Sequence, residues 1–193
     1  MDTVLVIVAT CMTILAAVFY NFYIHKGEIK PNLSSWLIWV FLQLLNSTTF
    51  FSMSSDWLKT TNAIVNGLAN ISILSYSLSK GQFKKLSGWD LSVLVLGLCI
   101  GAMWLFTKDA AKANTMLQSA FIIGFIPTIS GLIRNPNFEH KTPWLFFSLG
   151  HMISVLVILA RWNGRYEEIA YSLSSSFLNL VVLALTFRKK KNS

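Results

Sequence analysis

Long apolar blocks separated by short polar segments dominate the hydropathy pattern of this chain. A helix needs about 20 mostly apolar residues to cross the hydrocarbon core of a bilayer. Seven blocks come close to that length, and the charged residues lie at or beyond their ends, where an ion need not enter hydrocarbon. The pattern therefore predicts an all-α membrane protein with seven transmembrane helices. The predicted spans are Thr3–Ile24, Trp36–Met53, Thr60–Ser79, Asp90–Phe106, Ala113–Ile133, Trp144–Arg161 and Glu168–Phe187.

The composition excludes a soluble domain. Of the 193 residues, 54% are hydrophobic and only 12% are charged, whereas an average soluble domain has about 25% charged residues. The net charge of +8 comes from basic residues between the apolar blocks and in the tail, not from one basic face. We therefore expect the lipid bilayer as a partner and no nucleic acid.

The basic residues divide unevenly between the two sides of the predicted membrane. Eleven of the 16 Lys and Arg residues lie after the first, third, fifth and seventh spans, and five lie in the other loops. Because basic loops stay in the cytoplasm, the chain is expected in the cell membrane with its N-terminus outside and its C-terminus cytoplasmic. The tryptophans lie near span ends and are interpreted as interfacial anchors. They are Trp36, Trp39, Trp57, Trp89, Trp104, Trp144 and Trp162.

The first and last thirds of the chain share a register. When Trp36 is aligned with Trp144, Asn70 falls on Asn179 after one residue of slippage in an intervening loop. Two such triplets separated by one helix have the same orientation, as parallel repeats related by an axis along the membrane normal. We therefore predict two triple-helix bundles joined by a linker helix. The parts are residues 1–80, 81–112 and 113–193.

The predicted linker helix contains two glycines four positions apart, Gly97 and Gly101. Small residues at this spacing let a neighbouring backbone approach closely. The pair fits packing within the chain, and it also fits the interface of a homo-oligomer. The oligomeric state is left open.

The 3+1+3 arrangement is similar to that of the SWEET, PQ-loop and PnuC group of small-solute transporters. Ile126-Pro127-Thr128 resembles a PQ-loop motif with Thr in place of Gln, whereas the first half has Phe19-Tyr20 at the corresponding position. The segments Pro31-x4-Trp36 and Pro136-x2-Glu139-x4-Trp144 also resemble a group of bacterial seven-helix proteins. The resemblance implies a solute site near the midplane between two bundles that rock to give alternating access. It further implies that one asparagine from each bundle contacts the solute, and Asn70 and Asn179 match those positions.

Polar residues at helical spacing suggest where such a site lies. Asn62, Asn66 and Asn70 form one stripe, and the last span carries a second stripe of serines ending at Asn179. Amides both donate and accept hydrogen bonds, which suits a neutral solute. The same residues can instead join helices, at about 0.6 kcal/mol for each bond. The candidate substrate-binding residues are Asn46, Asn66, Asn70, His151, Ser175 and Asn179.

Two residues, His151 and Pro127, each have more than one interpretation. His151 is the only ionisable side chain well inside a predicted span. It fits a proton-coupling role, since imidazole titrates near neutral pH, and it fits a hydrogen bond within the bundle. Pro127 bends its helix and is a candidate hinge, although prolines are common in transmembrane helices.

The sequence holds no recognisable enzyme motif. It lacks HExxH and GxSxG, and no pair of aspartates lies inside a span. We therefore expect no enzyme, no metal site and no cofactor. The expected function is transport of a small, neutral polar solute by alternating access. The alternative is a receptor, scaffold or accessory subunit that kept the fold without transport.

Overall fold

The computed structural model describes residues 1–29, 31, 33–80 and 87–188. All regular structure in these ranges is helical, so the prediction of an all-α fold is confirmed. Each α-helix coincides with one predicted block to within a few residues. The helices are α1 (Asp2–His25), α2 (Leu33–Ser54), α3 (Trp57–Ser79), α4 (Gly88–Thr107), α5 (Ala110–Arg134), the 3-10 helix η1 (Pro136–Phe138), α6 (Lys141–Ala160) and α7 (Glu167–Thr186). Several residues of the charge comparison lie outside the described ranges, namely Lys30, Lys84, Lys85, Lys189, Lys190 and Lys191.

Six helices are long and apolar enough to cross a membrane, which is compatible with a multi-pass membrane protein. The remaining long helix, α3, has 23 residues but a more polar sequence. Its three asparagines are buried, whereas Leu68 and Leu78 are exposed. The asparagines of α3 therefore face the interior of the bundle, whereas its outer surface combines apolar residues with the exposed Ser72, Ser75 and Ser79.

Local sequence sets several of the helix ends. The Asp56 side chain caps α3 by accepting hydrogen bonds from the backbone amides of Leu58 and Lys59. Ser87 and Asp90 form a reciprocal capping box at the start of α4. These caps place the short connections at the ends of the bundle and leave the long apolar segments uninterrupted.

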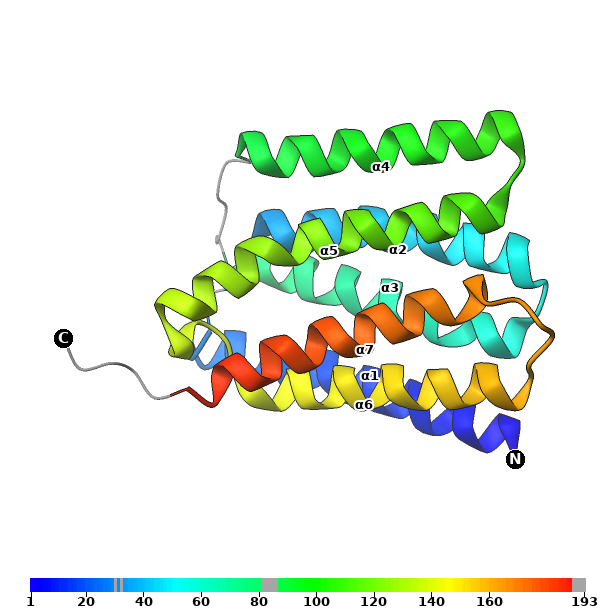
Figure 1. The fold of residues 1–193 in the computed structure, drawn as a ribbon. Coiled ribbons are helices and arrows are strands. Elements are labelled where there is room, and N and C mark those ends of the chain that lie inside the picture. Colours follow the sequence, from blue (N-terminus) through cyan, green and yellow to red (C-terminus); the bar gives the residue numbers. More distant parts are fainter. Residues whose placement is uncertain (30, 32, 81–86, 189–193) are drawn as a thin grey trace.

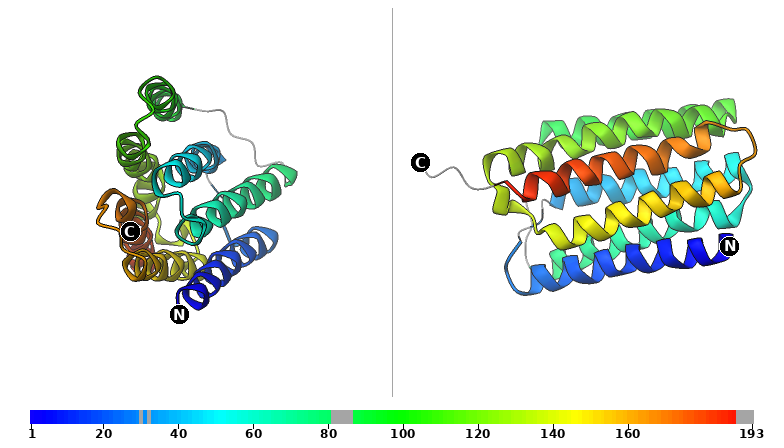
Figure 2. Two further views of the ribbon diagram at one scale, coloured as in Figure 1. Left: turned by 90° about the vertical axis from the view of Figure 1, so that its right-hand side faces the viewer. Right: turned by 60° about the horizontal axis from the view of Figure 1, so that its bottom comes forward.

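Six helices form a closed ring, and α4 packs outside it against α2 and α5 (Figure 2). Around the ring, the order of neighbours is α1, α3, α2, α5, α7, α6 and back to α1. The start of α1 and the end of α7 lie at opposite ends of the bundle (Figure 1). We call these the Met1 end and the Arg188 end.

Three tryptophans occupy the interior of the ring, so their interpretation as interfacial anchors is wrong. Trp36, Trp39 and Trp144 are 2%, 4% and 2% exposed. The indole is large and apolar and carries one N–H donor, which can be satisfied inside a bundle when a partner is near. Trp36 and Trp144 have such partners. Trp57 and Trp162 are exposed, as an anchor requires.

The two glycines of α4 face α2. A Cβ added to Gly97 would lie 2.8 Å from a methyl carbon of Leu42, and one added to Gly101 would lie 3.3 Å from Leu45. Of the two alternatives for this motif, the structure therefore uses it for packing within the chain.

An equally close contact, which the sequence did not reveal, joins α1 and α6 at Gly150. A Cβ there would lie 2.8 Å from Thr13 Oγ1 and 3.3 Å from the Ala9 carbonyl oxygen. We expect Gly150→Ala to lower the free energy of unfolding in detergent by about 1–3 kcal/mol, because backbone must shift to admit the methyl group. Gly88→Ala is the matched control, since no atom lies within 4 Å of its added Cβ. Equal thermal stability of the two variants would contradict this close packing.

Candidate functional site

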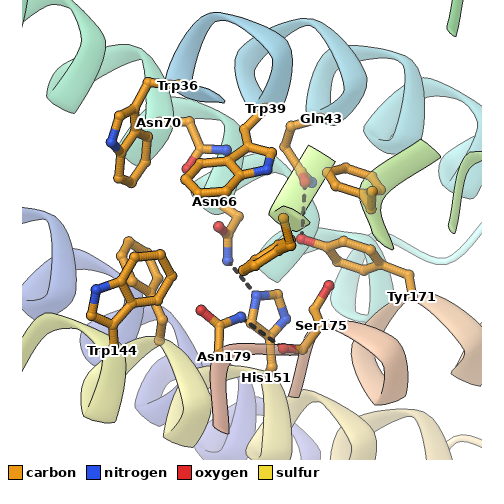
Figure 3. Close-up of a pocket in the computed structure, with 13 residues that line it drawn as sticks. Trp36, Trp39, Gln43, Asn66, Asn70, Trp144, His151, Tyr171, Ser175 and Asn179 are labelled. Atoms are coloured by element: carbon orange, nitrogen blue, oxygen red, sulfur yellow. Dashed lines mark hydrogen bonds between the residues drawn. The ribbon is translucent and has the colours of Figure 1, made fainter. Parts of the chain in front are cut away.

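A cavity with about 380 Å³ of empty space lies inside the ring of helices (Figure 3). Helices α2, α3, α5, α6 and α7 contribute to its wall, and α4 does not. The lining residues are Trp36, Trp39, Gln43, Asn66, Asn70, Phe121, Phe125, Trp144, Phe147, His151, Tyr171, Ser175 and Asn179.

Aromatic rings form one part of the wall, toward the Arg188 end. The Trp39 ring lies 4.9 Å from Trp36 and 4.8 Å from Phe125, measured between centroids. It lies 6.1 Å from Trp144 at a steep angle. Edge-to-face packing of this kind fixes ring orientation. The wall therefore offers rigid apolar faces on which a flat or ring-shaped solute could stack.

Polar side chains form the rest of the wall, and hydrogen bonds hold several of them in place. Asn66 Nδ2 lies 3.1 Å from His151 Nε2, which joins α3 to α6. Tyr171 Oη donates to Gln43 Oε1 at 3.0 Å, which joins α7 to α2 (Figure 3). These bonds cross between helices, so they position the side chains around the cavity.

Other polar atoms of the wall lack a partner within the described part of the chain. The Asn70 amide makes no hydrogen bond to another described residue, and Asn179 uses only Nδ2, on the Ser175 carbonyl. Buried Nδ1 of His151 and buried Nε1 of Trp39 are also unpaired. The Asn70 amide and the free oxygen of Asn179 can therefore hydrogen-bond to a molecule in the cavity, whereas the two buried nitrogens have no surface open to it.

The structure brings five of the six candidate residues to this one cavity. Asn66, Asn70, His151, Ser175 and Asn179 all line it. Their role as solute ligands stays a prediction. Gln43, whose place in an apolar span predicts that it faces inward together with Asn46, also lines the cavity. Tyr171 and the aromatic wall were not predicted, because aromatic residues are too common in spans to single out.

Asn46 is the one candidate residue that does not line this cavity. It is buried between α2 and α5, where its Oδ1 accepts hydrogen bonds from Asn114 Nδ2 at 3.1 Å and from Gln118 Nε2 at 3.3 Å. The amide joins two helices. Asn62 likewise accepts from the Thr13 hydroxyl at 2.9 Å, outside the cavity. The outer part of the asparagine stripe therefore serves helix packing.

Pro127 lies inside α5, two residues beyond the cavity residue Phe125. Proline cannot donate the backbone hydrogen bond at its position, and α5 bends along its length (Figure 1). The bend is close enough to the cavity for a hinge there to move the wall. A hinge function stays a prediction.

A buried ion pair lies between α3 and α7 on the Met1 side of the cavity. Lys59 Nζ of α3 lies 2.6 Å from Glu168 Oε2 of α7, and both side chains are buried. The other oxygen, Oε1, accepts from Asn163 at 2.9 Å. The sequence placed both charges near span ends but did not pair them. Lys59 and Glu168 are 109 positions apart, as are Asn70 and Asn179. The predicted alignment of Asn70 with Asn179 therefore also aligns Lys59 with Glu168.

A second, more exposed charge cluster lies at the same end. Arg161 contacts Asp56 at 2.8 Å and Asp2 at 3.2 Å. Burial alone would raise the pKa of Asp56, but hydrogen bonds from Arg161 and from two backbone amides hold that pKa below its usual value. Asp56 is therefore ionised at neutral pH, and the cluster ties the α2–α3 connection to the end of α6.

A buried carboxyl group lies on the opposite side of the cavity, toward the Arg188 end. Glu139 lies between η1 and α6 and is 6% exposed. Its Oε1 accepts from Tyr20 Oη at 2.9 Å, and its Oε2 accepts from Trp144 Nε1 at 3.2 Å. Burial raises the pKa of Glu139 to about 7. Glu139 lies in a loop between two predicted spans, where a carboxyl group is usually exposed, so the sequence did not indicate its burial.

No family model matches the chain, and comparisons with curated proteins and with solved structures found no match. What the cavity does is therefore inferred from its own residues. Its described lining can stack and hydrogen-bond but carries no Asp, Glu, Lys or Arg side chain. Among the described residues, no group of three His, Cys, Asp or Glu could hold a metal ion.

Proposed function

We propose that the chain is a multi-pass membrane transporter that moves a small, neutral, polar solute through the central cavity. The observation that carries this proposal is the unpaired Asn70 amide and the half-paired Asn179 amide in the wall of a cavity inside an apolar bundle. Transporter sites are built at the interface of repeats near mid-membrane. The likeness to the SWEET, PQ-loop and PnuC group is part of the proposal.

The register of the lining residues supports an arrangement of two parallel triple-helix repeats, α1–α3 and α5–α7, with α4 as the linker. Ten of the 13 lining residues form pairs at a nearly constant separation in the chain. The pairs 108 positions apart are Trp36 and Trp144, Trp39 and Phe147, and Gln43 and His151, and those 109 apart are Asn66 and Ser175, and Asn70 and Asn179. Equivalent residues meet around one axis when two repeats are related by twofold rotation.

The order of helices in the ring supports the same arrangement. Within the first triplet α3 lies between α1 and α2, and within the second α7 lies between α5 and α6. The largest contacts between the triplets are α1 with α6 and α5 with α2, and the smaller ones are α3 with α6 and α7 with α2. Each contact becomes the other member of its pair when α1, α2 and α3 are exchanged with α5, α6 and α7. A twofold axis along the bundle is the simplest symmetry that produces this pattern.

Alternating access is supported by the contacts that close each end. At the Met1 end, Lys59 of the first triplet pairs with Glu168 of the second. At the Arg188 end, Tyr20 of the first triplet donates to Glu139, which precedes α6. Both closures therefore join the two triplets. Rocking of one triplet against the other would open one end while keeping the other closed.

The proposed orientation places the Arg188 end in the cytoplasm. In the sequence, 11 of the 16 Lys and Arg residues follow the first, third, fifth and seventh helices, and five lie in the other loops. Of those five, Lys59 and Arg161 form ion pairs and Arg165 donates to the Met53 carbonyl, whereas Lys108 and Lys112 are exposed. An excess of basic residues favours the cytoplasmic side.

A ligand screen by thermal shift on purified protein tests the solute class. We expect a neutral sugar, nucleoside or similar ring-bearing amide to raise the melting temperature, since binding at 100 times Kd stabilises by about 2.7 kcal/mol. Charged analogues of the same compounds are the matched controls and should fail, because no described lining residue neutralises their charge. Equal stabilisation by charged analogues would contradict a neutral solute.

A further inference from the structure

We infer that Glu139 is a proton-binding site that controls access to the cavity from the Arg188 end. The inference rests on the proposed function, because a controlled entrance has meaning only if solutes use the cavity. It goes further by naming a second ligand, a proton, and the residue that binds it.

The geometry places Glu139 at the junction of both triplets. Its two oxygens accept from Tyr20 on α1 and from Trp144 on α6. Tyr20 Oη in turn accepts from Trp36 Nε1 at 3.2 Å, which adds α2. Trp36 and Trp144 are themselves lining residues. One carboxyl group therefore holds together three helices and both tryptophans at this end of the cavity.

No cation among the described residues neutralises this carboxyl group. None of the described salt bridges includes Glu139, and its hydrogen-bond donors are neutral. The neighbouring His140 ring stacks on Tyr23 at 3.6 Å, and the Lys141 ammonium lies 5.4 Å from the Phe187 ring. Several other described titratable groups lie at this end. His25, Lys26, Glu28, Lys80, Arg134 and Arg188 are exposed, Tyr76 is half-buried, and Asp90 is buried in the capping box of the outer helix α4.

Burial without a cation opposes the charged form. Desolvation raises the pKa of Glu139 to about 7, although hydrogen bonds from Tyr20 and Trp144 work in the opposite direction. If the Arg188 end opens, water reaches the carboxyl group and its pKa falls toward the usual 4.5. The closed state therefore binds the proton more tightly than the open state. Closure takes up a proton at Glu139, and opening releases it.

The direction of the pH dependence follows from this difference. Between about pH 4.5 and pH 7 the closed state holds more protons than the open state, so lowering the pH favours closure. Raising the pH toward 7 favours opening, and above 7 the effect levels off because both states are then ionised. A purely structural carboxyl group with an ordinary pKa would give no change across this window.

Thiol labelling of a cavity residue measures access directly. The reporter is Ser175→Cys in a background with Cys11→Ala and Cys99→Ala, because both native cysteines are free and exposed. A water-soluble thiol reagent is applied between pH 5.5 and pH 8, and each rate is divided by that of the same reporter carrying Glu139→Gln. This ratio cancels the ionisation of the thiol itself. We expect it to rise roughly tenfold or more and to level off above pH 7.

Two further variants keep the inference falsifiable if Glu139→Gln does not fold. Tyr20→Phe keeps the ring but removes a hydrogen bond that favours the carboxylate, so the pH at which labelling levels off should increase. His140→Gln is the matched control, because it removes the adjacent titrating group and should leave the pH response unchanged.

A flat ratio across this pH range, a ratio that falls as the pH rises, or an unchanged response in Tyr20→Phe would overturn the inference. Labelling needs no solute, so its result is separate from that of the proposed function. Labelling that follows pH without any solute uptake would reject transport and retain the proton site. Solute uptake combined with a flat labelling ratio would reject the proton site and retain transport.

Discussion

Replacing Lys59 with Met should lower the free energy of unfolding by about 3–5 kcal/mol. The substitution leaves the Glu168 carboxylate buried with only Asn163 as a partner, and an uncompensated buried charge is strongly destabilising. Thermal and chemical denaturation of the purified protein in detergent measures the change.

Two controls separate the buried pair from a general effect of charge removal. The double variant Lys59→Met with Glu168→Met removes both charges and should recover most of the lost stability. Lys26→Met removes one member of an exposed pair at 3.9 Å and should cost no more than about 1 kcal/mol. A double variant as unstable as Lys59→Met alone would show that the uncompensated Glu168 carboxylate is not the cause of the lost stability.

Replacing Asn70 or Asn179 with Ala should weaken solute binding roughly 5- to 150-fold, the effect of losing about 1–3 kcal/mol from a buried hydrogen bond. The thermal stability of the unliganded Asn70→Ala protein should change little, because this amide makes no hydrogen bond to another described residue. Isothermal titration or the ligand-dependent thermal shift measures both quantities.

Asn46→Ala is the matched control for these variants. The Asn46 amide joins α2 to α5 through Asn114 and Gln118, so its loss should lower stability and leave solute affinity nearly unchanged. The reverse pattern, with Asn70→Ala unstable and Asn46→Ala impaired in binding, would assign the cavity asparagines to helix packing.

The helices and part of the site could be predicted from the sequence because both follow from periodicity. An apolar block long enough to span a bilayer has few alternatives to a helix. Asn66 and Asn70 lie one turn apart, so they share a face wherever that helix packs. The correspondence of Asn70 with Asn179 follows from the register of Trp36 and Trp144 once one residue of slippage is allowed in an intervening loop.

The remaining features depend on tertiary contacts that periodicity does not encode. Whether Trp144 anchors in the interface or lies inside the ring depends on a partner for its N–H, and that partner is the loop residue Glu139. Asn46 is the same residue type as the cavity asparagines and also lies well inside a predicted span. Its neighbour on α5, however, is another amide, Asn114. The requirement for glycine at position 150 arises from the point at which α1 crosses α6, which the sequence pattern does not locate.

Uptake into proteoliposomes is the most direct test of the proposal that the cavity transports a solute. A compound that stabilises the purified protein would be supplied in radiolabelled form to vesicles containing the unmodified protein, Asn70→Ala or Asn46→Ala. We predict saturable uptake by the unmodified protein, a large loss in Asn70→Ala, and retained uptake per folded molecule in Asn46→Ala. Binding with no uptake above empty vesicles would contradict transport and would indicate a receptor or scaffold with the same fold.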